Sequence, residues 1–283
     1  MVPALFEGIP SELIDRFESG GPSALAFPPA VNGPRLTSSQ YAELLQGLGT
    51  RGGEPLALYI QVPFCPVRCL FCACHTTVTH DAERIDRYLD VLETEMDLVV
   101  RRLGVGKEVC QLQVGGGTPN YLSDAQLVRL MGMVEQRFRI REDADVGIEC
   151  NPRRASASQL ELLRSLGFKR ISLGVQDLDP TVQQAIGRIN SLDLIRDVHW
   201  TARDLGFETT SLELVYGLPR QTPAGFARTL EQIVALDPDR IACFGYSHQP
   251  SKRPHQFAID AESVPSSADK LTLLHEAVSM LTS

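Results

Sequence analysis

Apolar segments and amphipathic segments alternate along most of this chain, beginning at residue 57. The apolar segments are rich in Val, Ile, Leu and aromatic residues and have the length of buried strands. We expect strands at 57–62, 109–114, 146–150, 170–175, 210–215 and 240–246. We expect helices at 82–103, 123–137, 156–166, 178–187, 191–205 and 223–236. Repeated strand–helix units predict a parallel sheet with right-handed crossovers.

The ends of the expected helices carry residues that commonly begin and end helices. Serine side chains cap helix N-termini, and glycine readily adopts the left-handed conformation that ends a helix. These residues are Ser123, Ser156 and Ser191 at the starts, and Gly104, Gly167 and Gly206 at the ends. Because six units are too few to close an eight-stranded barrel, the predicted fold is α/β, an open (β/α)6 partial barrel with an N-terminal extension.

Residues 1–54 precede the first expected strand and form this N-terminal extension. Two short helices are expected in it, one over 11–19 and another that begins at Ser38 or Ser39. The stretch 21–30 between them is rich in Gly and Pro and should be irregular.

Composition argues against several classes of protein. The net charge of −8 disfavours non-specific binding to nucleic acid or to an anionic membrane. No run of about 18 apolar residues could span a bilayer, and the N-terminus does not have the pattern of a signal peptide. Seven cysteines, with four of them inside ten positions, fit a reducing compartment better than a set of disulfides. We therefore expect a cytoplasmic protein, and we expect it to be a monomer.

Polar residues follow the expected strands at their C-terminal ends, where the active sites of barrel proteins are built. The first strand leads into a cysteine-rich loop and the second into a run of three glycines. The other polar residues at this edge are Glu149, Asn151, Gln176, Glu213, Ser247 and His248. One edge of the sheet thus carries almost every candidate for a functional site.

The cysteine-rich loop places Cys65, Cys69 and Cys72 in the spacing C-x3-C-x2-C, followed by a fourth thiol at Cys74. Three thiolates on a short loop lack the fourth ligand that a structural zinc site needs. They can instead hold three irons of a four-iron, four-sulfur (4Fe-4S) cluster and leave the fourth iron open to a small molecule. The alternatives are a zinc loop completed by a distant ligand, or buried unpaired thiols.

The glycine-rich turn and two charged residues add weaker signals. Glycines at 115–117 would let a ligand approach the backbone closely, although a tight turn explains them equally well. Glu149 lies in an apolar strand, where a carboxylate needs a partner, either a ligand or an internal salt bridge. Arg188 could grip a carboxylate with two parallel hydrogen bonds, or it could be a solvated helix end.

The cysteine spacing, the turn GGGTP and the run LVYGLPRQT resemble those of radical S-adenosylmethionine (SAM) enzymes. Further residues narrow the resemblance to the oxygen-independent coproporphyrinogen III oxidases. Phe71 directly precedes Cys72, and Cys74 follows it by two positions. Tyr59 lies six residues before Cys65.

This resemblance implies a 4Fe-4S cluster on the three cysteines of the C-x3-C-x2-C spacing, one or two molecules of SAM, and a catalytic role for Cys74. It further implies a set of residues that contact SAM. These are Tyr59, Phe71, Gly116, Gly117, Thr118, Glu149, Gln176, Arg188, Glu213 and Ser247. Glu213 stands where the family usually has aspartate, and Ser247 stands where alanine is common, and both departures concern the site of the second SAM molecule.

The activity that the resemblance implies is the oxidative decarboxylation of two propionates of coproporphyrinogen III to vinyl groups. This reaction gives protoporphyrinogen IX in anaerobic heme biosynthesis. A 5′-deoxyadenosyl radical, made from SAM with one electron, would abstract the substrate hydrogen. The implied partners are a tetrapyrrole substrate and a low-potential electron donor. The alternatives are a heme-binding chaperone and another heme-handling radical SAM relative, including an inactive truncated paralogue.

Two departures from the family pattern concern the ends of the chain. The family's N-terminal segment GPRYTSYPTA finds its best match at 21–30, with Ser23 and Phe27 in place of arginine and tyrosine. The resemblance assigns a radical SAM core to 55–250. It leaves 251–283, with a helix expected at 266–282, as the start of a shortened C-terminal helical region.

The remaining cysteines and most histidines receive no functional role. Cys110, Cys150 and Cys243 fall inside expected strands and should be inert core thiols. The other histidines lack the paired spacing of metal ligands and are expected to be structural or on the surface. They are His75, His80, His199, His255 and His275.

Overall fold

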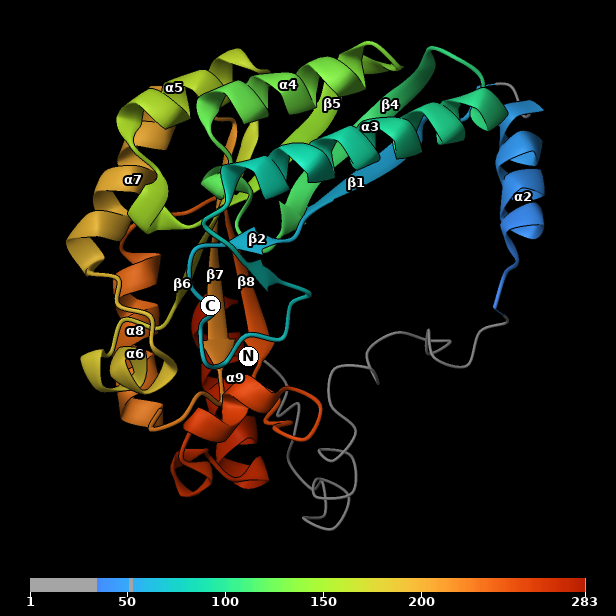
Figure 1. Cartoon of the computed structure of the whole chain (residues 1–283). Coiled ribbons are helices and arrows are strands. Elements are labelled where there is room, and N and C mark those ends of the chain that lie inside the picture. Colours follow the sequence, from blue (N-terminus) through green and yellow to red (C-terminus); the bar gives the residue numbers. More distant parts are fainter. Residues whose placement is uncertain (1–34, 51–52, 283) are drawn as a thin grey trace.

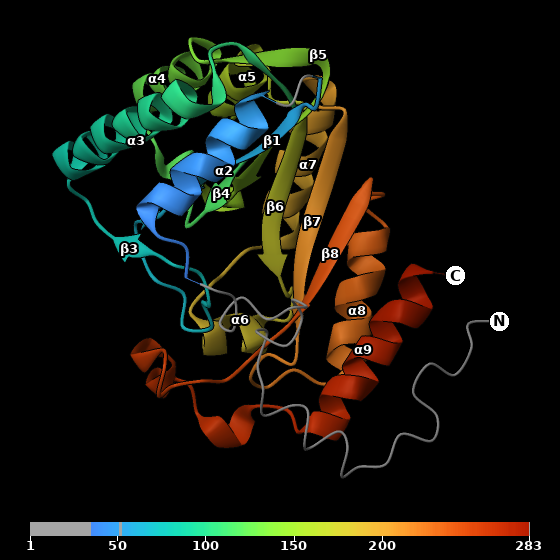
Figure 2. The ribbon, with the colours of Figure 1, turned by 90° about the vertical axis from the view of Figure 1, so that its right-hand side faces the viewer.

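The computed structural model of the chain describes residues 35–50 and 53–282. The expected helix at 11–19 and the irregular stretch 21–30 lie outside the described residues. The described part contains a six-stranded sheet, visible in Figures 1 and 2. Its strands are β1 (Leu56–Val62), β4 (Lys107–Gly116), β5 (Phe138–Cys150), β6 (Arg170–Gln176), β7 (Thr209–Tyr216) and β8 (Arg240–Gly245).

All neighbouring strands of this sheet are parallel, and their order, β1-β4-β5-β6-β7-β8, is the order along the chain. Strands β1 and β8 form two separate edges, so the sheet does not close on itself. The sheet curls, and helices lie along its outer face (Figure 2). The predicted open (β/α)6 partial barrel is confirmed.

Helices follow the strands at the positions that the sequence predicts. They are α3 (Ala82–Leu103), α4 (Asp124–Glu135), α5 (Ala157–Ser165), α6 (Pro180–Ile186), α7 (Leu192–Asp204), α8 (Pro223–Val234) and α9 (Ser267–Leu281). The side chains of Ser123, Ser156 and Ser191 each accept a hydrogen bond from the backbone amide three residues on, which confirms them as caps. The three predicted terminal glycines have φ between 83° and 93°.

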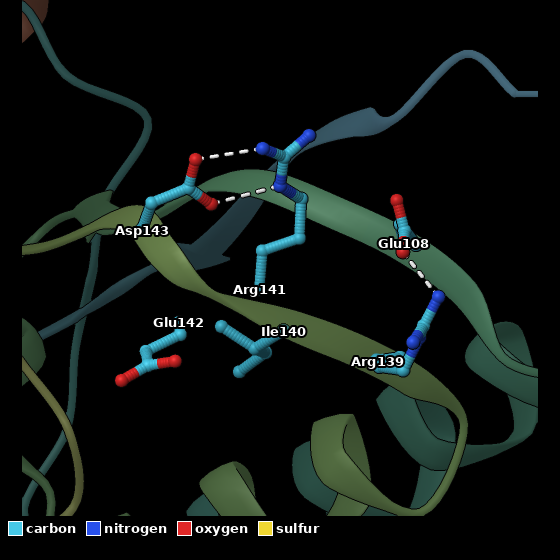
Figure 3. A pocket seen from close by; sticks show the side chains of 6 residues that line it. All are labelled: Glu108, Arg139, Ile140, Arg141, Glu142 and Asp143. Atoms are coloured by element: carbon cyan, nitrogen blue, oxygen red, sulfur yellow. Dashed lines mark hydrogen bonds and ion pairs between the residues drawn. The ribbon is translucent and has the colours of Figure 1, made fainter.

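Strand β5 is longer than the segment 146–150 that apolar patterning predicts. Its first residues pair with the start of β4, and the register then shifts between Val109 and Gln111. This part of the strand is rich in charged residues, so it lacks the apolar pattern by which strands are predicted from sequence. Arg139 pairs with Glu108, and Arg141 pairs with Asp143 at 2.6 Å, beside a hollow of about 500 Å³ (Figure 3). Polar partners thus replace apolar burial at this end of the sheet.

The helix α2 (Ser38–Thr50) precedes the first strand of the sheet in the sequence, and it packs against α3. Its expected cap at Ser38 or Ser39 is wrong, because the hydroxyl of Thr37 accepts from the amide of Gln40 at 3.3 Å. The neighbouring Thr37 amide donates in turn to the Gln40 side chain at 2.9 Å. The reciprocal pair places the helix start one residue earlier than a lone serine would.

One apolar core fills the space between the sheet and its outer helices. Its fully buried members include Leu112 of β4, Ile148 of β5 and Leu173 of β6, together with Leu89 of α3 and Leu127 of α4. Burying such a side chain stabilises a fold by about 1.5–3 kcal/mol. This core makes the sheet a rigid support for the loops at its C-terminal edge. Within residues 35–50 and 53–282, no helix has the length and apolar character needed to cross a membrane.

Candidate functional site

A pocket of about 390 Å³ lies at the C-terminal edge of the sheet. Loops that follow β1, β4, β5 and β6 line it, and Glu213 within β7 completes the lining. All of the predicted site residues line it except Tyr59 and Ser247. The lining members of that set are Cys65, Cys69, Phe71, Cys72, Cys74, Gly116, Gly117, Thr118, Glu149, Gln176, Arg188 and Glu213.

The cysteine loop follows β1, and a short two-stranded parallel sheet joins its two ends. Apolar patterning did not predict this sheet. Strand β2 (Phe64–Cys65) pairs in parallel with β3 (Thr77–Val78). The amide of Thr77 donates to the Pro63 carbonyl at 2.6 Å, and the amide of Thr79 donates to the Cys65 carbonyl at 3.2 Å. The two ends of the cysteine loop are therefore held together, and the thiols between them face the pocket.

The four thiols of the loop have different surroundings. Cys65 is buried, and its sulfur lies 3.2 Å from the hydroxyl of Thr118. Burial raises the pKa of the Cys65 thiol, and the Thr118 hydroxyl partly opposes this rise. A hydrogen bond from the Cys74 thiol is the largest cause that lowers the pKa of Cys72, to about 6. The same hydrogen bond raises the pKa of Cys74.

No three His, Cys, Asp or Glu side chains among the described residues converge closely enough to hold a single metal ion. Thiolates that each bind a different iron of one cluster do not need to meet at one point. The predicted ligand role of the three cysteines stays a prediction.

The glycine turn is built by close contact with its neighbours. A Cβ on Gly117 would lie 2.8 Å from the Phe64 carbonyl oxygen and 3.0 Å from the Cys65 sulfur. A Cβ on Gly115 would lie 2.5 Å from the Glu149 carboxylate. Gly116 has a φ of 122°, which side-chain-bearing residues rarely adopt. The glycines therefore let the turn pack directly against the cysteine loop and the next strand.

The half-buried carboxylate of Glu149 accepts a hydrogen bond from the Gly116 amide at 2.9 Å. Burial raises the pKa of this carboxyl, and the Gly116 amide acts in the opposite direction. The expected partner thus exists, but it is a backbone amide, and no Lys or Arg of the described chain forms an ion pair with Glu149. Nearby, the carboxylate of Glu213 accepts from the Ser172 hydroxyl at 2.7 Å.

Gln176 and Arg188 carry polar atoms that the protein leaves without a partner. The Gln176 Oε1 and Arg188 Nε atoms are buried, and neither has a hydrogen bond in the structure. Arg188 donates to the Gly174 carbonyl at 2.6 Å and lies 3.8 Å from the Cys69 sulfur. Gln176 has a φ of 72°, an uncommon conformation for a residue with a side chain. Unsatisfied atoms beside strained backbone are typical of a ligand site.

The two predicted residues that do not line the pocket lie nearby. The hydroxyl of Tyr59 donates to the Gln61 side chain at 3.2 Å, and burial together with Glu149 raises the pKa of Tyr59 to about 12. Ser247 accepts at its carbonyl from the Gln256 side chain at 3.4 Å. The sequence pattern placed both at the right edge of the sheet. It could not determine which direction their side chains take.

Sequence reasoning missed two residues that hold the cysteine loop from the far end of the chain. His255 Nε2 donates to the Cys72 carbonyl at 2.9 Å, and Gln256 Nε2 donates to the Phe71 carbonyl at 3.3 Å. Both belong to the turn η5 (Pro254–Ala258) after β8. His255 is structural, as expected, yet its contact is with the candidate site. No local pattern marks it, because its partner is 183 positions away.

A buried carboxylate directly after β6 was also missed. Asp177 is fully buried and accepts from Gln221 at 2.6 Å, from Thr229 at 2.8 Å and from the Asp179 amide at 2.7 Å. Burial raises the pKa of Asp177, and these donors oppose the rise. Its position directly after an apolar strand is the one signal that could have identified it. The network ties the β6, β7 and α8 segments together just behind Gln176.

One of the cysteines expected to be inert lies in the pocket. Cys150 ends β5, lines the pocket and is buried, which raises the pKa of its thiol. Cys110 and Cys243 do not line the pocket, and burial raises the pKa of Cys243 to about 11. His248, expected at this edge, lies 2.9 Å from the Tyr246 hydroxyl.

Comparison with known proteins places this architecture in a family. The model of the radical SAM superfamily matches residues 59–233. The chain belongs to the radical SAM superfamily. The chain is also similar to two relatives that are named oxygen-independent coproporphyrinogen III oxidase. It is 39% identical over 284 residues to the protein from Pseudomonas aeruginosa and 39% identical over 274 residues to that from Escherichia coli.

These alignments cover 96% and 95% of this radical SAM chain, but 59% and 58% of the relatives. The solved structure of the Escherichia coli coproporphyrinogen III oxidase, described as a radical SAM enzyme, superposes with a TM-score of 0.84 at 38% identity. It is matched over 90% of this chain and 58% of its own length. The chain therefore spans just under three fifths of the relatives it matches.

Membership of the radical SAM superfamily implies a 4Fe-4S cluster and SAM, and the pocket can be tested for its fit to both. Three thiols on one short loop supply soft ligands for iron. The glycine turn leaves backbone groups accessible to a ligand. The buried Oε1 of Gln176 and Nε of Arg188 have no hydrogen-bond partner in the described part of the protein and can bind polar groups of a cofactor. The residues present fit a cluster with an organic cofactor beside it.

Proposed function

We propose that this protein converts propionates of coproporphyrinogen III to vinyl groups by oxidative decarboxylation, as a step toward protoporphyrinogen IX in anaerobic heme biosynthesis. Relatives with that name at 39% identity support the proposal. The observation that carries it is the pocket. Thiols of the C-x3-C-x2-C loop share it with the glycine turn and with the unpartnered atoms of Gln176 and Arg188.

The cofactor pair, when bound, supplies one-electron chemistry that removes a hydrogen atom from an unactivated carbon. Cys65, Cys69 and Cys72 would hold the cluster. Arg188 would offer its free Nε–H, and Gln176 its free Oε1, to the polar groups of SAM. These two atoms are already desolvated, so a matching ligand atom recovers a hydrogen bond that folding left unmade.

The other residues of the pocket position groups and exclude water. Glu149, held by the Gly116 amide, would accept from the donor groups of SAM, and Phe71 would shield the cluster from solvent. Glu213 is the residue proposed to contact a second SAM molecule. Its carboxylate is oriented by the hydrogen bond that it accepts from the Ser172 hydroxyl. Cys74, exposed toward the pocket, is proposed as the catalytic thiol. A tetrapyrrole and a low-potential electron donor would be the partners.

Anaerobic reconstitution with iron and sulfide tests the proposal. The expected product holds about four irons per chain, forms 5′-deoxyadenosine on reduction with SAM, and converts coproporphyrinogen III to a lighter product by mass spectrometry. Cys69→Ser should abolish cofactor cleavage, whereas Cys110→Ser, a thiol outside the pocket, should keep it.

The outcomes separate the proposal from its competitors. A chain that takes up no iron contradicts the radical SAM reaction for this protein. A chain that holds the cluster and binds heme without cleaving SAM would be a heme-binding protein on the same scaffold. A different product mass from the porphyrinogen would indicate another heme-handling reaction.

A further inference from the structure

Two arginines stand at the pocket beyond the residues proposed to contact SAM. Arg153 and Arg154 belong to the turn η4 (Pro152–Arg154), which directly follows β5. Both side chains are exposed, and both line the same pocket as the cysteines. Nothing in the proposed cofactor contacts uses them.

The backbone that carries these arginines is held by buried amides. The Asn151 side chain accepts from the Arg153 amide at 3.2 Å. Asn120, which is fully buried, accepts from the Asn151 amide at 2.9 Å and donates to the Asn151 carbonyl at 3.2 Å. Such satisfied buried groups rigidify a segment, so the turn presents its two side chains from a fixed base.

Arg154 is further oriented by an aromatic ring. Its guanidinium carbon lies 4.7 Å from the centroid of the Tyr121 ring. Tyr121 is itself held by its hydroxyl, which donates to the Thr79 carbonyl at 2.9 Å. A cation–π contact uses no hydrogen bond of the guanidinium, so its N–H groups remain available for an acceptor.

Neither arginine forms an ion pair with any residue of the described chain. The contrast with the charged hollow at the other end of the sheet is clear, because there Arg139 pairs with Glu108 and Arg141 with Asp143 (Figure 3). The two carboxylates that line the pocket are engaged elsewhere, Glu149 with the Gly116 amide and Glu213 with Ser172. The positive charge at the pocket is therefore available to an anion.

We propose that Arg153 and Arg154 bind a carboxylate of the substrate at the mouth of the pocket. The inference rests on the proposed function, which makes the substrate a tetrapyrrole with several carboxylate side chains. The oriented guanidinium of Arg154 and that of its neighbour Arg153, carried on the same held turn, would anchor one carboxylate side chain. The rest of the macrocycle would then be oriented toward the reacting carbon. The pair would select acidic tetrapyrroles over their neutral counterparts.

Equilibrium binding to the full chain, without cluster or SAM, tests this site. The probes are coproporphyrin III and its neutral tetra-amide, followed by fluorescence at constant salt. Arg153→Gln and Arg154→Gln should each weaken binding of the acid about tenfold and leave binding of the amide unchanged. Arg240→Gln is the matched control. Arg240 is exposed at the N-terminal end of β8, whereas the pocket lies at the C-terminal edge of the sheet.

Lysine variants distinguish the loss of a charge from a general loss of folding. Arg153→Lys and Arg154→Lys keep the charge, so each should bind the acid more tightly than its glutamine counterpart. The proposal is overturned if the wild-type chain binds no coproporphyrin, if acid and amide bind alike, or if both glutamine variants bind the acid as the wild type does. Failure of SAM cleavage in the reconstituted protein would instead contradict the proposed function, and arginine-dependent binding of the acid would still support the carboxylate site.

Discussion

His255 donates a hydrogen bond from Nε2 to the carbonyl oxygen of Cys72 at 2.9 Å, and so joins the turn after the last strand to the loop after the first. Gln256, fully buried beside it, makes the matching contact with the Phe71 carbonyl. The cysteine loop is held at its other side by the Leu70 amide, which donates to the Ile186 carbonyl at 3.0 Å. The loop is thus clamped from two elements that are remote in the sequence.

Removing the histidine clamp should make a bound cluster more labile. A net hydrogen bond is worth about 1 kcal/mol, so His255→Ala should release iron to a chelator about fivefold faster than the wild type. The measurement is the rate of iron release under anaerobic conditions. His275→Ala, on the exposed face of α9, is the control and should behave as the wild type does. Equal release rates for all three proteins would show that the contact has no effect on the cluster.

The hydroxyl of Thr118 should govern the reactivity of Cys65 in the cluster-free chain. This hydroxyl opposes the rise that burial causes in the pKa of Cys65, so Thr118→Val should raise that pKa further. Less thiolate is then present near neutral pH, and alkylation of Cys65 should be slower and should accelerate only at higher pH. Thr118→Ser keeps the hydroxyl and should react as the wild type does. Mass spectrometry of the peptide with Cys65 gives the rates, and a faster reaction of the valine variant would refute the assignment.

A methyl group on the glycine turn should disrupt its contact with the cysteine loop. Gly117→Ala places a Cβ 2.8 Å from the Phe64 carbonyl oxygen, so backbone must move, and we expect about 2 kcal/mol of destabilisation. Gly132→Ala is the control. Gly132 lies inside α4 with open space around it, and alanine there should be neutral or stabilise by about 0.5–1 kcal/mol. Urea unfolding of both variants measures the difference, and an undisturbed Gly117→Ala variant would contradict the packing described above.

The half-buried carboxyl of Glu149 should make stability depend on pH. Burial raises its pKa in the folded chain, so the folded state retains this proton at a pH where the unfolded state has lost it. Stability from this group is complete below the unfolded pKa of about 4.5 and is lost as the pH rises through the folded value. Glu149→Gln should therefore become more stable relative to the wild type as the pH rises from about 4 through the raised folded pKa.

Urea unfolding across that range measures the Glu149 effect. Glu161→Gln, an exposed change on α5, should show a constant difference from the wild type and serves as the control. A constant difference for Glu149→Gln as well would mean that its carboxyl titrates alike in the folded and unfolded states.

Much of the fold was accessible from local patterns. Apolar periodicity located the six strands, and serine and glycine located helix ends such as Ser123 and Gly104. These signals work because they are local. The formation of a strand, the capping of a helix and the reversal of the chain at its end all depend on residues close together in sequence. The same patterns missed the first half of β5, where ion pairs such as Arg141 with Asp143 replace apolar side chains.

The sequence by itself determined the open parallel sheet, the edge at which the polar residues gather and the cysteine spacing that suits a cluster. Only the tertiary structure decided that Tyr59 and Ser247 stand outside the pocket lining, and that His255 holds Cys72. It also brought Arg153 and Arg154 to the pocket without a carboxylate partner. Spacing within a strand or loop is set by local covalent geometry, whereas the meeting of distant side chains depends on how far the whole sheet curls and on what the core permits.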